Sequence, residues 1–403
     1  MKVGNFIKPN QYSYSSKDKW EYIYYLDTGN ITENRIDEIV KLNPLTDKIP
    51  SRAKRKVKKG NIIYSTVRPN QKHYGYVDKQ YDNLLVSTGF VVIDVNEDIA
   101  DGKYFYYWLT QEKNTNYLQT IAENTVATYP SIAPKDIENM SIELPALDIQ
   151  RKIAKILSNY DDLLENNNKR IKILEEMAQK IYKEWFVDFK YPGHETATFK
   201  DTELGRIPSD WEVKTLKDTI DSIKETIKPG EHLKNLRYVP IDCIPRKSFF
   251  LTTSESYKNA QSSLILFKKS DILFGNMRSY FHKVILAPFD GITRTTCFVL
   301  RPKVDNYRSW VFLTMFQDST VAYSSRNSKG ATIPYSFWED GLAEMKVIFP
   351  STKIIKAFND IINPMLENIQ QGYFKQENLK QTRDLLLPRL MSGEINVEDL
   401  EIA

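Results

Sequence analysis

Two stretches of the chain, residues 147–190 and 351–392, carry hydrophobic residues separated by alternating steps of four and three. In the first stretch these residues are Ile149, Ile153, Ile156, Tyr160, Leu163, Leu174, Met177 and Ile181. In the second they are Ile355, Phe358, Ile362, Met365, Ile369, Leu379, Leu386 and Leu390. The two series are interrupted at Asn167 and Arg170 and at Gly372, Gln376 and Arg383. Heptad spacing is typical of coiled-coil helices, so each stretch is predicted to form one long helix.

Each predicted helix needs a packing partner along its length. A helix of about 38 residues extends ~57 Å, beyond the diameter of a small domain. Either each helix packs on the globular segment next to it, or the two helices pack on each other. The length favours the second alternative, and the polar interruptions would then help to fix the register. Pro364 and Pro388 are expected to kink or end the second helix, because proline removes a backbone donor.

The segments that precede the two helices repeat each other in order. The matched pairs are Val57–Arg68 with Phe267–Arg278, Ser87–Val92 with Thr295–Leu300, Ala127–Pro130 with Ala331–Pro334, and Glu138–Pro145 with Ala343–Pro350. Only small insertions separate the two copies. The chain is therefore predicted to contain two copies of one globular unit, each followed by a helix, which suits a target that is itself bipartite.

Short β-rich segments alternate with turn residues inside each copy. Residues 61–67 and 89–95 are predicted strands, and 101–119 and 307–317 are predicted helices. The fold class is therefore α/β (α+β) and multidomain. The predicted parts are a first globular domain at 1–146, a long helix at 147–190, a linker and second globular domain at 191–350, a second long helix at 351–392, and a tail at 393–403.

Composition places the chain among folded proteins. Of its 403 residues, 41% are hydrophobic and 27% are charged, and the net charge of +4 is only weak support for an anionic partner. The two cysteines, Cys243 and Cys297, indicate a reducing compartment without a disulfide framework. No signal peptide or segment of membrane-spanning length is present, so a cytoplasmic location is expected.

Motifs for catalysis are missing from the sequence. There is no phosphate-binding loop of the Walker type and no dinucleotide fingerprint. The four histidines stand apart from other metal-ligating residues, so no metal site is expected. The segment 188–190 has the tail spacing of a nuclease site but follows a helix, and the chain lacks the Asn/Asp-Pro-Pro-aromatic tetrapeptide of amino-methylating enzymes. The sequence favours binding over catalysis.

The repeated segments also hold the candidate binding residues. In each copy a lysine pair precedes a predicted strand that ends near an arginine. Lysines can neutralise phosphates, arginine can bond O6 and N7 of guanine, and asparagine can read adenine. The candidates for DNA contact are Lys58, Lys59, Tyr64, Thr66, Arg68, Lys268, Lys269, Asn276 and Arg278. Two structural alternatives remain: the lysines are turn residues, and the arginines form a salt bridge that holds the repeated fold.

The two copies differ around the shared arginine. Residues 66–71 read Thr-Val-Arg-Pro-Asn-Gln, and residues 276–281 read Asn-Met-Arg-Ser-Tyr-Phe. Two units with one scaffold and different side chains at these positions would recognise two different half-sites.

Three segments resemble conserved regions of a known family, the specificity subunits of type I restriction–modification systems. Glu175–Phe189 is similar to the family's central conserved region, Leu204–Val213 to the start of its second target-recognition domain, and Thr382–Ile395 to its distal conserved region. The resemblance covers essentially the whole chain. One departure is visible, because the first half offers only Asp18–Glu21 in place of the Ile-Pro-x-x-Trp motif at the start of the domain.

The resemblance implies a non-catalytic subunit that recognises double-stranded DNA through two target-recognition domains. It also implies two antiparallel helices and an approximate two-fold axis. The expected partners are two methyltransferase (modification) subunits and restriction/translocase subunits. S-adenosylmethionine, ATP and Mg would belong to those partners, with no cofactor on this chain. The rival interpretations are a coiled-coil scaffold or adaptor with two protein-binding heads, and a recognition module of another methyltransferase or nuclease type.

Overall fold

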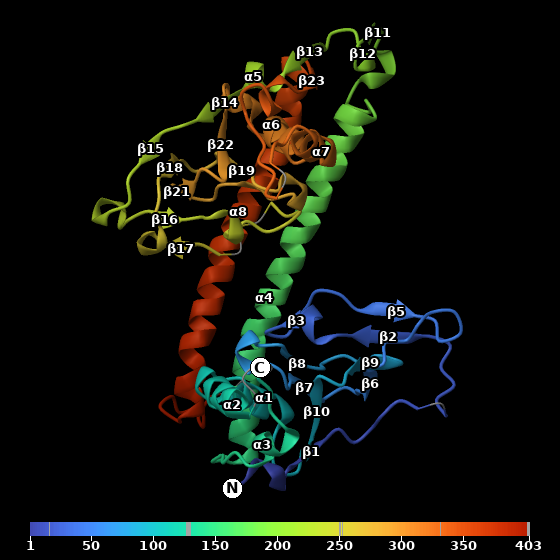
Figure 1. Cartoon of the computed structure of the whole chain (residues 1–403), viewed down its shortest axis with the longest axis vertical. Helices are drawn as coiled ribbons and strands as arrows, with labels where there is room; N and C mark the ends of the chain where they lie inside the picture. Colours follow the sequence, from blue (N-terminus) through green and yellow to red (C-terminus); the bar gives the residue numbers. More distant parts are fainter. Residues whose placement is uncertain (16, 126–129, 250, 252, 331, 401–403) are drawn as a thin grey trace. The chain divides into compact units, whose positions relative to one another are not determined.

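The computed structural model of the chain contains two compact units (Figure 1). The first comprises Met1–Leu163 together with Leu379–Ala403, and the second comprises Leu164–Asn378. The structure describes residues 1–15, 17–125, 130–249, 251, 253–330 and 332–400. Residues 127–129 and 331, which belong to one of the repeated sequence motifs, therefore lie outside the described residues.

Two four-stranded sheets form the globular part of the first unit. One sheet has the order β1-β10-β7-β8, with all neighbours antiparallel. Its strands are β1 (Ile7–Pro9), β10 (Phe90–Val95), β7 (Ile62–Ser65) and β8 (Tyr74–Tyr76). The other has the order β5-β2-β9-β6, in which β2 and β9 run parallel. Its strands are β5 (Val40–Leu42), β2 (Ile23–Leu26), β9 (Leu84–Ser87) and β6 (Ala53–Lys56).

Short elements complete this globular part. A small hairpin consists of β3 (Ile31–Thr32) and β4 (Arg35–Ile36), and the helices are α1 (Gly102–Leu109), α2 (Glu112–Thr125) and α3 (Pro134–Glu138). The Asp101 carboxylate caps α1 by accepting a hydrogen bond from the Tyr104 N–H at 2.8 Å. The single helix predicted at 101–119 is therefore wrong in detail, because the chain turns at Thr110–Gln111 and starts a second helix.

The second unit repeats the topology of the first. Its first sheet has the order β14-β22-β19-β20, with strands β14 (Ile220–Ile223), β22 (Cys297–Pro302), β19 (Ile272–Gly275) and β20 (Val284–Leu286). Its second sheet has the order β15-β18-β21-β16-β17, with strands β15 (Thr226–Ile227), β18 (Leu264–Phe267), β21 (Gly291–Arg294), β16 (Arg237–Tyr238) and β17 (Glu255–Ser256). The parallel pair β16 and β21 corresponds to β2 and β9.

The helices and remaining strands of the second unit extend the repeat. Helices α6 (Arg308–Met315) and α7 (Asp318–Arg326) correspond to α1 and α2. The further elements are the hairpin β11 (Phe199–Thr202) and β12 (Gly205–Pro208), the pair β13 (Glu212–Thr215) and β23 (Lys346–Phe349), and the short helix α5 (Leu216–Thr219). The predicted duplication of one mixed α/β unit is confirmed.

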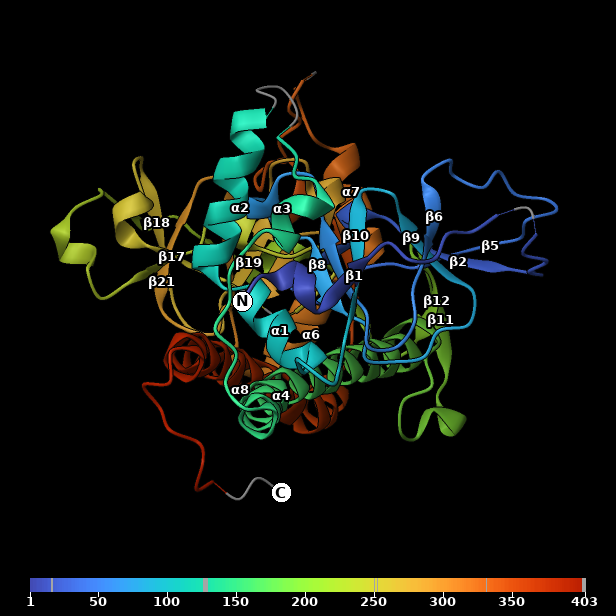
Figure 2. The same cartoon turned by 90° about the horizontal axis from the view of Figure 1, so that it is seen from below.

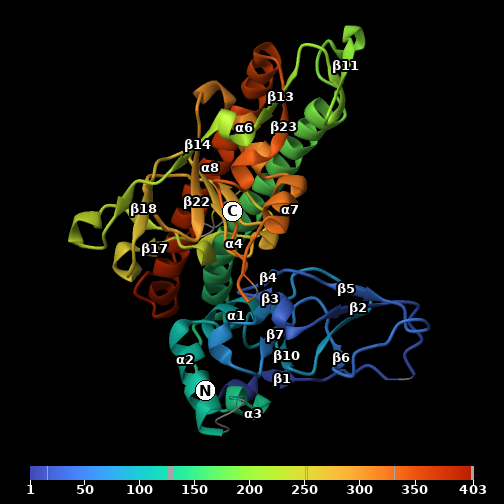
Figure 3. The same ribbon diagram turned by 45° about the horizontal axis from the view of Figure 1, so that its top comes forward.

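Two long helices, α4 (Leu147–Tyr182) and α8 (Thr352–Met391), contribute to both units. In the first unit α1 packs on α4, and Figure 2 shows the two helices together. In the second unit α6 lies against both long helices (Figure 3). Tyr182 of α4 shares a hydrogen bond of 3.0 Å with Thr314, and the Ser309 hydroxyl donates to Oδ1 of Asn363 in α8. Each globular part is thus fixed to the helix pair.

The two long helices are antiparallel within each unit, as expected. In the second unit Asn167 lies beside Gly372 and Gln376, while Tyr182, further along α4, lies beside Phe358, earlier in α8. The polar interruptions face each other, because the Asn167 amide donates to the Gly372 carbonyl at 3.0 Å and to Gln376 Oε1 at 2.9 Å. In the first unit Arg383 bonds Asp161 at 2.7 Å.

The packed face of α4 differs in part from the predicted series. Leu163 and Met177 are each 45% exposed, while Leu164, Ile171 and Ala178 are buried. Leu157 is buried while Ile156 is only half-buried, so the buried positions shift by one residue already before Tyr160. A straight helix repeats every 3.6 residues and therefore drifts away from a strict heptad. The series of α8 is correct at Ile355, Phe358, Ile362, Ile369 and Leu390, all of which are buried.

Neither proline ends α8 at its own position. The helix assignment runs through Pro364, whose carbonyl accepts a hydrogen bond of 2.8 Å from the Asn368 amide, and continues to Met391, three residues beyond Pro388. The tail after α8 then returns to the first unit, where Val397 is 1% exposed. In the described part of the chain, no helix combines the length and the apolar character needed to cross a membrane.

Candidate nucleic-acid interface

Each globular part carries a loop with the same unusual backbone. The first loop is residues 68–72 and the second loop is residues 278–282. Arg68 (φ 46°) and Lys72 (φ 56°) flank a short 3-10 turn in the first, and Arg278 (φ 51°) and His282 (φ 53°) flank the same turn in the second. A non-glycine residue in this left-handed region costs about 1–2 kcal/mol. Strain that is kept in both copies points to a function for these loops.

Backbone hydrogen bonds fix both loops in the same way. The Arg68 N–H donates to the Pro130 carbonyl at 3.0 Å, and the Arg278 N–H donates to the Pro334 carbonyl at 2.9 Å. In the first loop a side chain of α2 adds a further hydrogen bond, because the Asn70 N–H donates to Gln119 Oε1 at 3.1 Å. The loops are therefore rigid supports for the side chains they carry.

His282 anchors the second loop to α7. Its Nδ1 lies 3.0 Å from Asp318 Oδ1, and its side chain is almost fully buried. Burial lowers the pKa of His282, although Asp318 acts in the opposite direction, so the imidazole is neutral at pH 7. Because Nδ1 of this neutral ring faces a carboxylate oxygen, the ring proton is on Nδ1.

A connection between two strands of the second sheet braces each loop. Glu33 lies at the turn of the β3–β4 hairpin, within the connection between β2 and β5, and donates its N–H to the Lys72 carbonyl at 2.9 Å. Lys247, between β16 and β17, donates its N–H to the His282 carbonyl at 2.9 Å. Both residues have positive φ, 47° and 51°. Glu33 and Lys247 therefore occupy equivalent positions and carry opposite charges.

The two bracing residues form different ion pairs. Glu33 lies 3.0 Å from Lys72 Nζ and 3.6 Å from Lys380 Nζ. Burial alone would raise the pKa of Glu33, but the hydrogen bond from Lys72 and the charge of Lys380 hold it below its usual value. Lys247 Nζ lies 3.1 Å from Asp318. The same backbone brace is thus combined with different surface charges in the two units.

The loops expose different side chains. In the first loop Arg68, Asn70 and Gln71 are exposed, so two amides lie next to the arginine. In the second loop Tyr280 is 52% exposed, and the guanidinium of Arg246 lies 3.9 Å from the centre of the Phe281 ring. Amides offer hydrogen bonds to base edges, whereas aromatic rings and stacked guanidinium groups offer planar surfaces as well.

Three predicted contact residues turn out to support the loops from inside. Tyr64 is 1% exposed and stacks on Tyr74, and burial raises its pKa to about 12. Asn276 is 7% exposed and its amide donates to the Thr295 carbonyl at 2.9 Å. The Thr66 hydroxyl donates to the Gly89 carbonyl at 2.9 Å. The burial of Tyr64 and Asn276 argues against direct base contact, because a side chain enclosed by the protein does not reach a base edge.

The lysine pairs lie at the other end of the strands from the arginines. Lys58 and Lys59 precede β7 and Arg68 follows it, just as Lys268 and Lys269 precede β19 and Arg278 follows it. A four-residue strand spans about 13 Å. The structure therefore does not bring the lysines and the arginines into one cluster. Lys58 also forms an ion pair with Asp94 at 2.8 Å.

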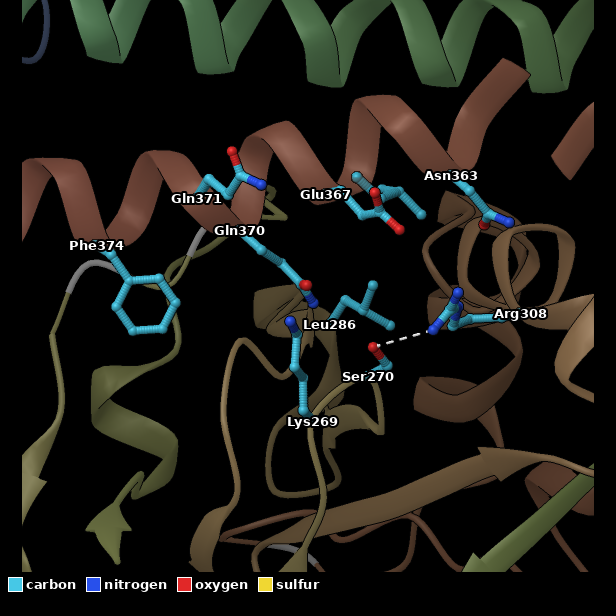
Figure 4. Close-up of a pocket in the computed structure, with 10 residues that line it drawn as sticks. Lys269, Ser270, Leu286, Arg308, Asn363, Glu367, Gln370, Gln371 and Phe374 are labelled. Carbon is cyan, nitrogen blue, oxygen red and sulfur yellow. Dashed lines mark hydrogen bonds between the residues drawn. The ribbon is translucent and has the colours of Figure 1, made fainter. Parts of the chain in front are cut away.

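Lys269 extends toward α8, where it lines a cavity of the second unit (Figure 4). Ser270 and Arg308 lie on the same side of this cavity, and the Arg308 Nη1 donates to the Ser270 hydroxyl at 3.3 Å. Helix α8 contributes Glu367 and Gln370. Because Lys269 and Arg308 line the cavity together with Glu367, the cavity does not favour ligands of either charge. The Lys269 side chain faces a helix rather than the second loop.

Several residues near the two loops were not predicted from the sequence. Arg246, Lys247 and Glu33 lie in the connections between strands, where the two copies share no sequence motif. The adjacent basic residues Arg246 and Lys247 are visible in the sequence, but only the structure shows that they lie beside the second loop. Among the described residues, no cluster of three or more His, Cys, Asp or Glu side chains could hold a metal ion.

The sequence model of the Type I restriction modification DNA specificity domain matches this chain twice, over residues 3–176 and 208–373. The Type I restriction enzyme HindI specificity subunit of Haemophilus influenzae is 25% identical, with 93% of this chain and 94% of that protein covered. The MjaIX specificity subunit of Methanocaldococcus jannaschii is 28% identical, with 94% and 85% covered.

A solved structure shares the fold. The crystal structure of a type I restriction–modification system S subunit from M. genitalium matches with a TM-score of 0.57 and 15% identity, covering 97% of this chain and 95% of that one. Each match of the family model covers one copy of the α/β unit and a large part of the long helix that follows it. The chain therefore belongs to the family of type I restriction–modification DNA specificity subunits.

Proposed function

We propose that this chain is the non-catalytic DNA-recognition subunit of a type I restriction–modification enzyme. Its two globular parts would each read one half of a bipartite, asymmetric target in double-stranded DNA. Helices α4 and α8 would serve as the spacer, so that the bases between the half-sites are not read. Two domains that dock on one face of DNA favour half-site centres about one turn, ~10 bp, apart.

The observation that carries this proposal is the pair of loops. The first and second loops share their left-handed arginine, their 3-10 turn and their brace, yet one presents amides and the other presents an aromatic pair beside Arg246. A common scaffold with different exposed side chains is what reading two different half-sites requires. We assign Arg68 and Arg278 to base contact in their own half-sites.

The lysine pairs keep a proposed role in phosphate contact. Lys59, Lys268 and Lys269 are exposed and lie away from the loops, so they would touch the backbone of flanking DNA rather than the bases read by the arginines. Tyr64, Thr66 and Asn276 would act indirectly, by holding the loop backbone.

The proposed partners are those that membership of this family implies. We propose that two methyltransferase subunits and the restriction/translocase subunits bind it, and that S-adenosylmethionine, ATP and Mg act on those partners. The complex would work in the cytoplasm, where its DNA is found, and the two buried cysteines are both free.

Genome-wide mapping of methylated adenines tests the proposal. Cells that express the chain with its methyltransferase subunits should show one bipartite motif. Exchanging residues 1–146 for the first domain of another family member should change one half-site and leave the other intact. A continuous motif, a change in both half-sites, or methylation without any motif would contradict the proposal. The chain purified alone should show no nuclease, methyltransferase or ATPase activity.

A further inference from the structure

We infer that Arg246 is the residue that reads a guanine in the half-site of the second unit. This inference rests on the proposed function and adds a specific residue and a specific base to it. Arg246 lies in the connection between β16 and β17, beside the second loop, and its side chain is exposed. The sequence repeat gives no sign of it, because the first unit has no arginine at the matching position.

The guanidinium of Arg246 is held in a defined orientation. Its central carbon lies 3.9 Å from the centre of the Phe281 ring, and Phe281 in turn packs edge-to-face on Tyr280 at 4.8 Å. In the described part of the chain, no carboxylate lies within ion-pair distance of Arg246, whereas Arg237 and Arg301 are paired with Glu377 and Asp271. Stacking on a ring leaves the in-plane N–H donors of arginine available for a ligand.

The residues after Arg246 fix the backbone from which it projects. The Lys247 N–H bonds the His282 carbonyl at 2.9 Å, and the Lys247 ammonium pairs with Asp318 at 3.1 Å. Two positions further on, Phe249 is 3% exposed and packs on Phe316 at 4.5 Å. Arg246 therefore lies on a short segment whose far end is part of the core.

A residue of helix α4 also holds this segment in place. The carboxylate of Glu175, which is 7% exposed, accepts hydrogen bonds from the Ser248 hydroxyl at 2.8 Å and from the Phe249 N–H at 2.6 Å. A buried carboxylate that bonds backbone and side-chain donors is a strong tether. Glu175 thus acts as a positioning residue. A side chain fixed before binding loses little conformational entropy on contact with DNA, which favours discrimination.

The first unit lacks this arrangement. Since Glu33 and Lys247 are equivalent, the residue that matches Arg246 is Thr32. Its hydroxyl lies 3.4 Å from His73 Nδ1, and threonine has no guanidinium group. Only the second unit therefore offers a stacked guanidinium at this place, and the effect of Arg246 should be confined to one half-site.

Guanine is the base that suits such a group. In the major groove its O6 and N7 atoms are two adjacent acceptors, and a planar guanidinium can bond both at once. Adenine offers one acceptor and one donor at these positions, so a fixed arginine is left with an unsatisfied contact. Loss of a good bidentate contact lowers affinity by about 5- to 150-fold.

The test uses the full chain assembled with its methyltransferase subunits. The motif is first mapped from methylated adenines, and exchange of residues 1–146 identifies the half-site that belongs to the second unit. Duplexes then carry 7-deazaguanine, which lacks the N7 acceptor, at each guanine of that half-site in turn. We expect one position to weaken binding of the unaltered complex and to have no further effect on Arg246→Ala.

Two variants serve as controls. Arg246→Lys keeps the charge but cannot form the paired contact, so it should relax the same base position. Arg206→Ala removes another arginine stacked on a phenylalanine of the second unit, with its guanidinium 5.6 Å from the Phe199 ring, and should leave the motif unchanged. Both positions are exposed, so the variants should fold, which a thermal melt checks.

Several outcomes would overturn the assignment. These are a second half-site without guanine, unchanged discrimination in Arg246→Ala, relaxation at a base other than guanine, or equal weakening for every sequence, which would indicate a phosphate contact. In each case the bipartite motif would still stand, and with it the proposed function. Methylation that follows no motif in the unaltered complex would instead contradict the proposed function itself, and with it this assignment.

Discussion

The two units share a backbone and differ in how its polar groups are used. Both place an arginine of left-handed conformation before a 3-10 turn, and both brace that turn through a residue of positive φ. The brace is Glu33 in one unit and Lys247 in the other. The exposed loop residues include the amides Asn70 and Gln71 in the first unit and the aromatic Tyr280 in the second. Backbone hydrogen bonds are independent of side-chain identity, so a loop held by them can change its surface without changing its shape.

The helix pair shows a second difference. In the first unit Asp161 accepts hydrogen bonds from Arg383 at 2.7 Å and from the Tyr107 hydroxyl at 2.5 Å. In the second unit the helix pair instead uses the neutral amide of Asn167, together with aromatic contacts such as Phe186 on Phe358 at 4.7 Å. A partly buried ion pair depends on both partners, because loss of one leaves a charge without compensation. The first unit should therefore be more sensitive to single changes along the helices.

Arg383→Ala gives the sharpest test of this difference. Loss of a hydrogen bond between charged groups should lower the stability of the first unit by about 1.5–3 kcal/mol. Asn167→Ala should cost the second unit only about 0.5–1.5 kcal/mol. Hydrogen exchange resolved by segment measures both. Arg389→Ala, which removes an exposed pair with Glu394, is the control, with an effect below about 1 kcal/mol. Equal loss of protection in both units would remove the distinction.

Removal of residues 393–403 asks whether the tail belongs to the first unit alone. The truncation exposes the surface covered by Val397, which is 1% exposed, and breaks the 2.5 Å bond from Lys152 to the Glu398 carbonyl. We expect the first unit to lose about 1.5–2 kcal/mol, with the second unit unchanged. Leu400→Ala, at a position that is 46% exposed, is the mild control. Unaltered melting of the truncated chain would show that the tail contributes nothing.

Arg68→Gly and Arg278→Gly separate recognition from folding. Glycine adopts positive φ without strain, so each change should shift stability by less than about 1 kcal/mol. Each should nevertheless lower affinity for the cognate duplex by about 1–3 kcal/mol and relax one base position in its own half-site. Titration against cognate and mutated duplexes measures this effect. If either variant melts lower but binds normally, that arginine is part of the fold instead.

The lysine pairs should give the smallest effects. Lys59→Ala and Lys269→Ala should each weaken binding to all sequences alike and reduce the slope of log affinity against log salt by about 1. Lys58→Ala is a matched comparison, because Asp94 already neutralises part of that charge, and its slope should change less. Titrations of the complex with DNA at several salt concentrations measure these slopes. A change in base preference would assign these lysines to the bases instead of the phosphates.

Much of the fold was predictable from the sequence because it rests on local patterns. The repeat around Arg68 and Arg278 predicted the duplicated α/β unit, and the series through Ile355, Phe358 and Ile362 predicted the packed face of α8. The polar interruptions at Asn167 and Gln376 were also visible, and they do face each other. Periodicity reports which side of an element is apolar, and repetition reports a shared topology.

Contacts between distant segments were not predictable in the same way. Leu163 and Met177 fit a heptad but are exposed, since the packed face of a straight helix drifts away from a strict heptad. Tyr64 and Asn276 carry suitable chemistry but point into the core. The lysines and arginines stand ten or so residues apart in sequence, and only the strand between them sends them to opposite ends.

Spacing and repetition in the sequence were enough to predict two related domains, two long helices and an arginine shared by the two copies. The tertiary structure alone decided which side chains meet at each loop. Arg246 reaches Phe281 across 35 positions of sequence, and Glu175 clamps Phe249 across 74. Such pairs produce no periodic pattern in the sequence. Their proximity comes from the path of the sheets and from the packing of the second globular part on α4.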